Sequence, residues 1–222
     1  MNRSKCARCG LVNSASDEVC RRCAAALSPD TLIEEISRTG QGKKRGVGRR
    51  ALWIVGSTLT LLFAWYLSML LTSEELNFDR RQTLAQAFAV LEQKGFSRQA
   101  FVLSHLVNYR DTDNWWNRSV GHHDAFAATN FPFEVVTLYP EFFDVAVDDT
   151  ERAAILLHET YHLFGSGEAA ALEGVWRDKQ RLGWTADRYS QTKVWRNTRD
   201  STTALVPKLF QCGADEHSDC VP

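Results

Sequence analysis

The sequence predicts an α+β domain in the C-terminal part of the chain, preceded by a small cysteine-rich ribbon and one transmembrane helix. Three observations support this: two Cys-x-x-Cys pairs near the N-terminus, a long uncharged apolar run, and a later His-Glu-x-x-His segment. They divide the 222 residues into a ribbon at 1–27, a basic linker at 28–50, a membrane helix at 51–72 and an outer domain at 74–222.

The ribbon contains four cysteines, Cys6, Cys9, Cys20 and Cys23, in the pattern Cys-x2-Cys-x10-Cys-x2-Cys. Four thiolates in two close pairs form a closed tetrahedral zinc site. A segment of about 27 residues buries too little apolar surface to fold alone. We therefore expect a structural zinc ion to supply the stability of this segment.

This segment resembles the small zinc-ribbon domains found at protein N-termini. Gly10 suits the tight turn after the first cysteine pair, whereas the second pair has Ala24 in the same place. The ribbon is basic, but no aromatic residue lies between Met1 and Gly48 to stack on bases. We expect contact with a cytoplasmic protein partner, or a purely structural role, in preference to nucleic-acid binding.

The run from Ala51 to Thr72 contains no charged residue. As a helix it would be about 33 Å long, which matches the hydrocarbon core of a bilayer. Residues 1–50 hold 11 Lys and Arg against 5 Asp and Glu, a net charge of +6, and residues 73–222 carry a net charge of −7. The positive-inside rule predicts a single-pass protein with a cytoplasmic N-terminus and an extracytoplasmic C-terminal domain.

The outer domain contains two more cysteines, Cys212 and Cys220. In an oxidising compartment they can form a disulfide that closes a short C-terminal loop. Two free thiols are the alternative.

The segment from His158 to Glu168 has the pattern H-E-x-x-H-x-x-G-x-x-E. On a helix, residues i and i+4 share one face with Cβ atoms about 5–6 Å apart, so His158 and His162 can reach one metal ion. Glu159 lies beside them and is free to act as a base. The arrangement suits a catalytic zinc ion that activates a water molecule.

A catalytic zinc site needs a third protein ligand. Gly165 and Gly167 can end the helix and reverse the chain. Glu168 opens a second predicted helix, from which its carboxylate can return to the metal. Glu173 is the second candidate for the third ligand, and Asp178 is a more distant one.

Helical periodicity predicts further elements of the outer domain. We expect helices at Asp79–Lys94 and Glu168–Leu182, and Thr150 as the N-cap of the helix that carries the histidines. Residues 101–107 fit either a helix or a strand. Residues 111–124 are predicted to form a loop.

With these residues the chain resembles the zincin metallopeptidases. His158, Glu159 and His162 match the zincin motif, and Glu168 would be a third ligand of the gluzincin kind. The glycine spacing is also similar to the metzincin pattern, but no methionine follows the motif to form a Met-turn. The resemblance covers roughly residues 130–183 and implies a zincin-like α+β domain.

The resemblance also implies an edge strand that aligns a peptide substrate upstream of the active helix. The segment from Phe131 to Tyr139 is rich in β-branched and aromatic residues and precedes Pro140. An extended substrate would add to it by main-chain hydrogen bonds. A plain core strand is the alternative.

We therefore expect a membrane-anchored zinc metallopeptidase that acts on a peptide or protein and contains one catalytic and one structural zinc ion. Glu159 would take the proton of the activated water and pass it to the leaving amine. A further donor should stabilise the oxyanion, and the sequence offers several candidates. These are Tyr139, Tyr189, His122, His123 and His217.

Two other functions fit the same residues. The first is a non-catalytic receptor or regulatory protein in which the outer zinc ion is structural. The second is a cell-envelope hydrolase that acts on a non-protein amide, such as a peptidoglycan cross-link.

Overall fold

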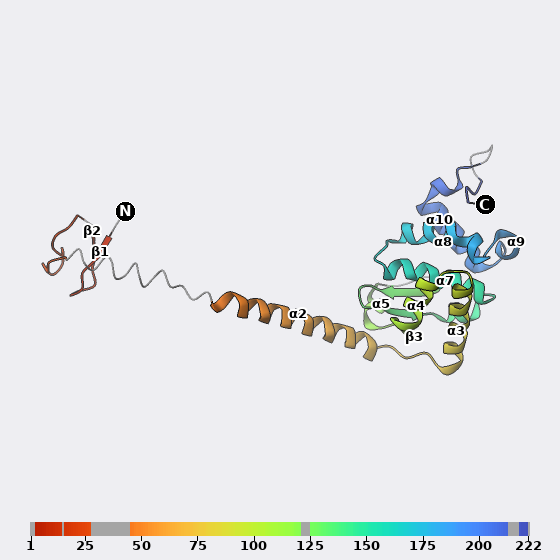
Figure 1. The fold of residues 1–222 in the computed structure, drawn as a ribbon, viewed down its shortest axis with the longest axis horizontal. Helices are drawn as coiled ribbons and strands as arrows, with labels where there is room; N and C mark the ends of the chain where they lie inside the picture. Colours follow the sequence, from red (N-terminus) through yellow and green to blue (C-terminus); the bar gives the residue numbers. More distant parts are fainter. Residues whose placement is uncertain (1–2, 15, 28–44, 121–124, 213–217, 222) are drawn as a thin grey trace. The chain divides into compact units, whose positions relative to one another are not determined.

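The structure is a computed structural model in which helices predominate and a small sheet makes the chain α+β, as the sequence predicts. The chain divides into two compact units, residues 1–60 and 61–222, with the boundary inside helix α2 (Arg45–Leu71). The structure describes residues 3–14, 16–27, 45–120, 125–212 and 218–221 (Figure 1). Residues 28–44 of the predicted basic linker lie outside these ranges.

The N-terminal segment contains an antiparallel pair of short strands, β1 (Arg3–Lys5) and β2 (Val12–Ser14). Each cysteine pair forms a tight turn. In both turns the residue after the second cysteine donates its N–H to the carbonyl of the first cysteine at 2.9 Å. That residue is Gly10 in one turn and Ala24 in the other, with φ of 73° and 53°. Ala24 thus adopts the left-handed conformation that usually favours glycine.

Helix α2 contains a stretch, Gly48–Leu71, that is long and apolar enough to cross a membrane. Only 6% of its most apolar window is buried inside the structure, so it is not a core helix. Its large side chains near the N-terminal end, such as Trp53 and Ile54, are about two-thirds exposed, at 68% and 67%.

The second unit begins with helix α3 (Phe78–Gln93), which confirms the helix predicted from Asp79 to Lys94. Helix α4 (Ser97–His105) follows, and strand β3 (Asn108–Arg110) comes after it. The ambiguous segment at residues 101–107 is therefore mainly helical.

Residues 111–124 are not entirely a loop, because they contain helix α5 (Trp115–Val120). The side-chain oxygen of Asn114 accepts hydrogen bonds from the N–H groups of Trp116 and Asn117 and so caps this helix.

The sheet has three strands in the order β3-β5-β4. Strand β5 (Val135–Leu138) pairs in parallel with β3 and antiparallel with β4 (Ala127–Asn130). All four residues of β5 are buried. The edge-strand interpretation of Phe131–Tyr139 is therefore wrong, and the alternative of a core strand is confirmed, because this segment supplies the central strand. The two edge positions belong to β3 and β4.

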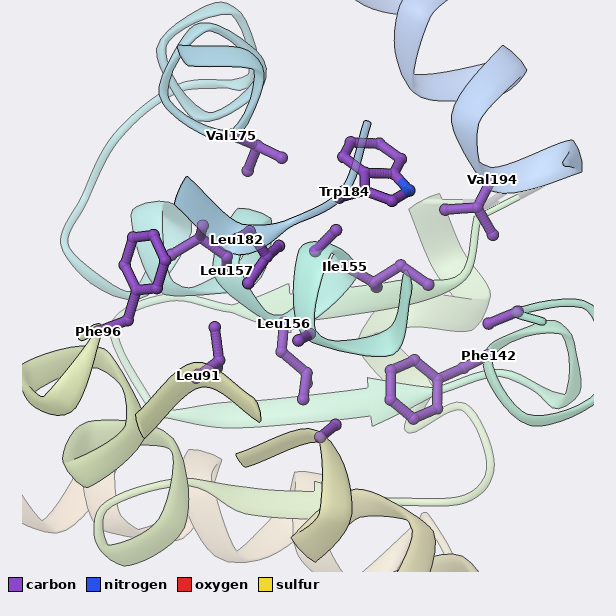
Figure 2. Close-up of a cluster of buried hydrophobic side chains, with 14 of the residues drawn as sticks. Leu91, Phe96, Phe142, Ile155, Leu156, Leu157, Val175, Leu182, Trp184 and Val194 are labelled. Atoms are coloured by element: carbon purple, nitrogen blue, oxygen red, sulfur yellow. The ribbon is translucent and has the colours of Figure 1, made fainter. Parts of the chain in front are cut away.

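Helix α7 (Asp149–Leu163) carries the two histidines and is the centre of the second unit. It packs against α3, α4 and β4, and on its other side against helix α8 (Glu168–Leu182). Figure 2 shows Leu156 and Leu157 of α7 among apolar side chains that include Leu91 of α3 and Val175 and Leu182 of α8.

The sequence suggested Thr150 as the N-cap of α7. In the structure the N-cap is Asp148. The Oδ1 atom of Asp148 accepts hydrogen bonds from the N–H groups of Thr150 and Glu151 at 3.0 and 3.1 Å. A short helix, α6 (Pro140–Asp144), precedes it.

Helix α8 has the bounds predicted for it, and Gly183 ends it with a left-handed φ of 80°. The remaining elements are α9 (Ala186–Tyr189), α10 (Lys193–Leu205) and the 3₁₀ helix η1 (Pro207–Phe210).

Glu151 joins α7 to the beginning of α10. Its carboxylate is fully buried and accepts hydrogen bonds from the indole N–H of Trp184 at 3.4 Å and from the hydroxyl of Thr192, the N-cap of α10. A buried carboxylate is costly unless it is hydrogen-bonded, so this contact fixes how α10 approaches α7.

The C-terminal segment is attached to α8. Cys212 and Cys220 form a disulfide bond, and between the two cysteines Asp219 accepts from the Trp176 indole at 3.1 Å and pairs with Lys179 at 3.2 Å.

Gly174 allows α7 and α8 to approach each other closely. A Cβ atom at this position would lie 2.3 Å from Cζ of Tyr161 on α7. The Tyr161 hydroxyl donates to Asp178 of α8 at 3.3 Å. The absence of a side chain at Gly174 therefore makes room for the Tyr161 ring between the helices.

We expect Gly174→Ala to lower the free energy of unfolding by about 1–3 kcal/mol, because the added methyl group overpacks this interface. Chemical denaturation of the full chain in detergent measures the effect. In a Tyr161→Ala background the same substitution should be neutral or slightly stabilising, since alanine favours a helix over glycine. An equal loss in both backgrounds would show that the Tyr161 ring is not the constraint.

Candidate functional site

The two histidines of the motif converge on one point. His158 and His162 lie one turn apart on α7, and their Nε2 atoms are 3.0 Å from each other. Both imidazoles are partly buried, with side-chain exposures of 18% and 22%. The edge-to-face arrangement of the rings directs both Nε2 atoms toward the beginning of α8.

Glu168, the first residue of α8, completes the group. Its Oε1 lies 3.4 Å from His158 Nε2, and its Oε2 lies 3.0 Å from His162 Nε2. Ligand atoms about 2.0–2.1 Å from a tetrahedral zinc ion are roughly 3.3 Å apart, so the three side chains fit zinc. The donor set of two imidazoles and one carboxylate, open on one side, is typical of a catalytic site.

The alternative third ligand, Glu173, is engaged elsewhere. Its carboxylate pairs with Arg177 at 2.8 Å and with Lys208 at 3.0 Å. Asp178, the more distant candidate, accepts a hydrogen bond from Tyr161. Of the three acids considered, only Glu168 joins the histidines in a group that could hold a metal ion.

A hydrogen bond outside the ligand group orients one of the imidazoles. His162 Nδ1 lies 2.9 Å from the carbonyl oxygen of Ser166. A proton on Nδ1 that is donated to this carbonyl leaves the Nε2 lone pair free for a metal. Such a second contact is the usual way in which proteins fix the tautomer of a metal-binding histidine.

The turn between α7 and α8 brings Glu168 to the two histidines. Gly165 has a φ of 80°, its N–H donates to His162 O, and the N–H of Ser166 donates to Tyr161 O, both at 2.9 Å. This is the Schellman arrangement that ends a helix at a left-handed glycine. It reverses the chain within a few residues and places Glu168 opposite His162.

The charges of the group favour a cation. The pKa of the Glu168 carboxyl lies well below its usual range, because it is hydrogen-bonded to His158 and His162. The same contact with Glu168 raises the pKa of His162 to about 9. The raised pKa favours a proton on His162, and a metal ion bound to this group would displace that proton.

Glu159 faces the same site from α7 and is not part of the ligand group. It is 4% exposed, and its Oε2 accepts a hydrogen bond from the hydroxyl of Thr129 at 2.6 Å. Thr129 lies on the edge strand β4 and holds the carboxylate in place. Thr129 was not identified from the sequence, because strand β4 had not been predicted.

An open cleft of about 740 Å³ contains these groups. It is lined by residues of β4 and the turn after it and by His158, Glu159 and His162 of α7. Polar side chains of α10 also line it, and none of them was identified from the sequence. They are Asn197, Thr198, Asp200 and Ser201.

Of the oxyanion donors suggested by the sequence, the two in the described part of the chain lie outside the cleft. Tyr139 donates its hydroxyl to Asp113 at 2.7 Å, and Tyr189 donates to Asp148 at 2.8 Å. Neither tyrosine lines the cleft. The remaining candidates, His122, His123 and His217, lie outside the described residues.

The four ribbon cysteines form a second group that could hold a metal ion. Their Sγ atoms lie within 4.8 Å of one another, with Cys6–Cys23 and Cys9–Cys20 separations of 3.6 and 3.5 Å. Zinc–sulfur bonds of about 2.3 Å imply sulfur–sulfur distances of roughly 3.8 Å, close to those observed.

Backbone contacts favour the thiolate form of two of these cysteines, Cys6 and Cys20. The N–H groups of Arg22 and Cys23 lower the pKa of the Cys20 thiol to about 6. In the same way the N–H groups of Cys9 and Arg8 lower the pKa of Cys6. At Cys23 a hydrogen bond from the Ala25 N–H acts in the same direction, but burial and contacts with the other three cysteines raise the pKa of this thiol to about 12. Thiolates are the form that binds zinc.

No protein-family model, no curated protein and no solved structure matches the chain. The assignment of the site therefore depends on its own residues and their geometry.

We expect Glu168→Ala to weaken zinc binding at the outer site by at least tenfold, because it removes one of three ligands, whereas Glu173→Ala should leave it unchanged. Competition with a chromophoric chelator measures both, in a background with the four ribbon cysteines replaced by serine. The reverse order of effects would identify Glu173 as the ligand.

Proposed function

We propose that this chain is a membrane-anchored, zinc-dependent metallopeptidase. The observation that carries the proposal is the convergence of His158, His162 and Glu168 beside a separate carboxylate, Glu159, in an open cleft. A structural zinc site is usually closed by four protein ligands, whereas a catalytic site keeps one position open. Among the described residues this group contains three ligands, which supports a hydrolase over a receptor with structural zinc.

The edge strand supports a peptide as the substrate. Strand β4 pairs with β5 on one side, and its residues Ala127, Ala128 and Thr129 line the cleft. An extended peptide can add to such an edge by main-chain hydrogen bonds. A non-protein amide would make less use of this edge, which favours a peptidase over a hydrolase of other cell-envelope amides.

Each residue has a definite part in the proposed reaction. When bound, zinc would polarise the scissile carbonyl and acidify the attacking water. His158, His162 and Glu168 hold the ion. Glu159 accepts the proton of the water and delivers it to the leaving amine, and Thr129 keeps the carboxylate aimed at that position.

The membrane anchor is helix α2. Its length and its exposed apolar side chains support a membrane span, and the net positive charge of residues 1–50 supports a cytoplasmic N-terminus. The catalytic domain would then be extracytoplasmic, where the Cys212–Cys220 disulfide is stable. The zinc ribbon would lie in the cytoplasm and bind a protein partner there.

We expect Glu159→Gln to retain zinc and to lose peptide hydrolysis by at least a hundredfold, because glutamine has the same shape but cannot accept the proton. Metal content and cleavage of a peptide library by the full chain, with and without chelator, measure the two properties. Glu141→Gln, on the short helix α6, is a matched control that should cleave normally. Wild-type cleavage by Glu159→Gln would rule out the proposed mechanism.

A further inference from the structure

The last turns of helix α2 are built into the outer domain. Trp65 stacks on Trp116 of α5 with ring centroids 4.8 Å apart and also contacts Phe133 at 5.7 Å. The Trp115 indole donates to Ser68 Oγ at 2.9 Å. We call Trp65, Trp115, Trp116 and Phe133 the aromatic collar.

The connection after α2 is short and fixed to the domain. Six residues separate Leu71 from Phe78, the first residue of α3. Within them the N–H of Glu74 donates to Thr112 Oγ1 at 2.9 Å, and the carbonyl of Thr72 accepts from Arg118 at 2.6 Å. The domain is therefore attached directly to the end of α2 and not through a flexible stalk.

The position of the collar along α2 sets its height relative to a bilayer. The apolar stretch Gly48–Leu71 has 24 residues and is about 36 Å long, some 6 Å more than the hydrocarbon thickness. Trp65 lies six residues, or about 9 Å, before its end. The collar therefore lies within about 9 Å of the C-terminal end of the span, close to the membrane–water interface that tryptophan prefers. Trp115 remains 43% exposed there, and the nearby Val120 is 60% exposed.

The turn between β4 and β5, residues 131–134, joins the collar to the cleft. Phe133 contacts Trp65, and Phe131, two residues earlier and at most about 7 Å away along the chain, lines the cleft. Phe131 packs beside Gly165, where an added Cβ would lie 3.7 Å from its ring, and it is still 58% exposed. One rim of the cleft is therefore apolar and next to the collar.

A buried amide network makes the collar and the edge strand one rigid piece. Asn114 donates to Asn130 at 2.7 Å, Asn130 donates to Asn117 at 2.7 Å, and Asn117 donates to Thr137 at 2.9 Å. These residues tie α5 to both β4 and β5. Because Thr129 of β4 holds Glu159, the height of the collar also determines the height of the reactive groups.

We propose that the cleft takes as its substrate the extended segment that immediately flanks a membrane span of another protein. This inference rests on the proposed peptidase function. Phe131 and the collar rest on the lipid surface, and the substrate enters along β4 from the membrane side. A peptide bond far from the bilayer reaches the cleft less often, because the domain is attached directly to the end of α2 and stays close to the bilayer.

The test uses the full chain in phosphatidylcholine vesicles and a synthetic anchored substrate. The substrate is a single apolar helix followed by several copies of one short sequence that the protein cleaves in a random library. Mass spectrometry then maps the cuts. We expect the copy next to the membrane to be cut at least ten times faster than copies more than about 30 residues away. The same repeat without its anchor should be cut evenly, which controls for position in the chain.

The cutting pattern distinguishes a failure of the membrane-proximal substrate from a failure of the peptidase function. Even cutting of all anchored copies would overturn the membrane-proximal substrate and leave the peptidase intact. No zinc-dependent cutting of the anchored or the free repeat would overturn the peptidase and this inference with it.

A second measurement does not depend on activity. Vesicles that contain a photoactivatable phospholipid should label residues 115–120 and 131–133 as well as α2. Leu205 on α10, with a similar exposure of 51%, is the internal comparison and should remain unlabelled. Labelling confined to α2 would contradict the proposed contact of the domain with the membrane.

Discussion

The close packing of α7 on α8 is the constraint on which the rest of the site depends. The left-handed turn at Gly165 ends α7 and brings Glu168, on the next helix, within 3.0–3.4 Å of both imidazoles. The contact of His162 with the Ser166 carbonyl belongs to the same turn, so helix termination and ligand orientation have one cause. Gly174 then allows the helices to stay close along their length. Without this packing, two histidines on one helix face would lack a third ligand.

Residues with strong local signals were predicted from the sequence. The spacing of His158 and His162 and the bounds of α8 depend on helical periodicity and on a terminal glycine, which act within a few residues. The structure brings the two histidines together with Glu168, whereas Glu173 pairs with Arg177 and Lys208, partners whose position depends on tertiary packing.

Features set by long-range pairing were missed. The segment Val135–Leu138 has the composition of a strand, but composition does not reveal whether a strand is central or at an edge. Strand β4, with its two alanines, has little β signal of its own and is formed by pairing with β5. Thr129 and the polar residues of α10 reach the site only through such tertiary contacts, so local patterns could not identify them.

The central proposal is that one divalent ion is bound by two imidazoles and one carboxylate in the C-terminal domain. Zinc K-edge absorption spectroscopy of the full chain, with the four ribbon cysteines replaced by serine, tests this most directly. This proposal predicts one zinc ion per chain, two imidazole ligands, oxygen or nitrogen at about 2.0–2.1 Å and no sulfur. Replacing His158 and His162 should abolish the signal. Absence of zinc from the unmutated outer site, or zinc retained after both histidines are replaced, would contradict it.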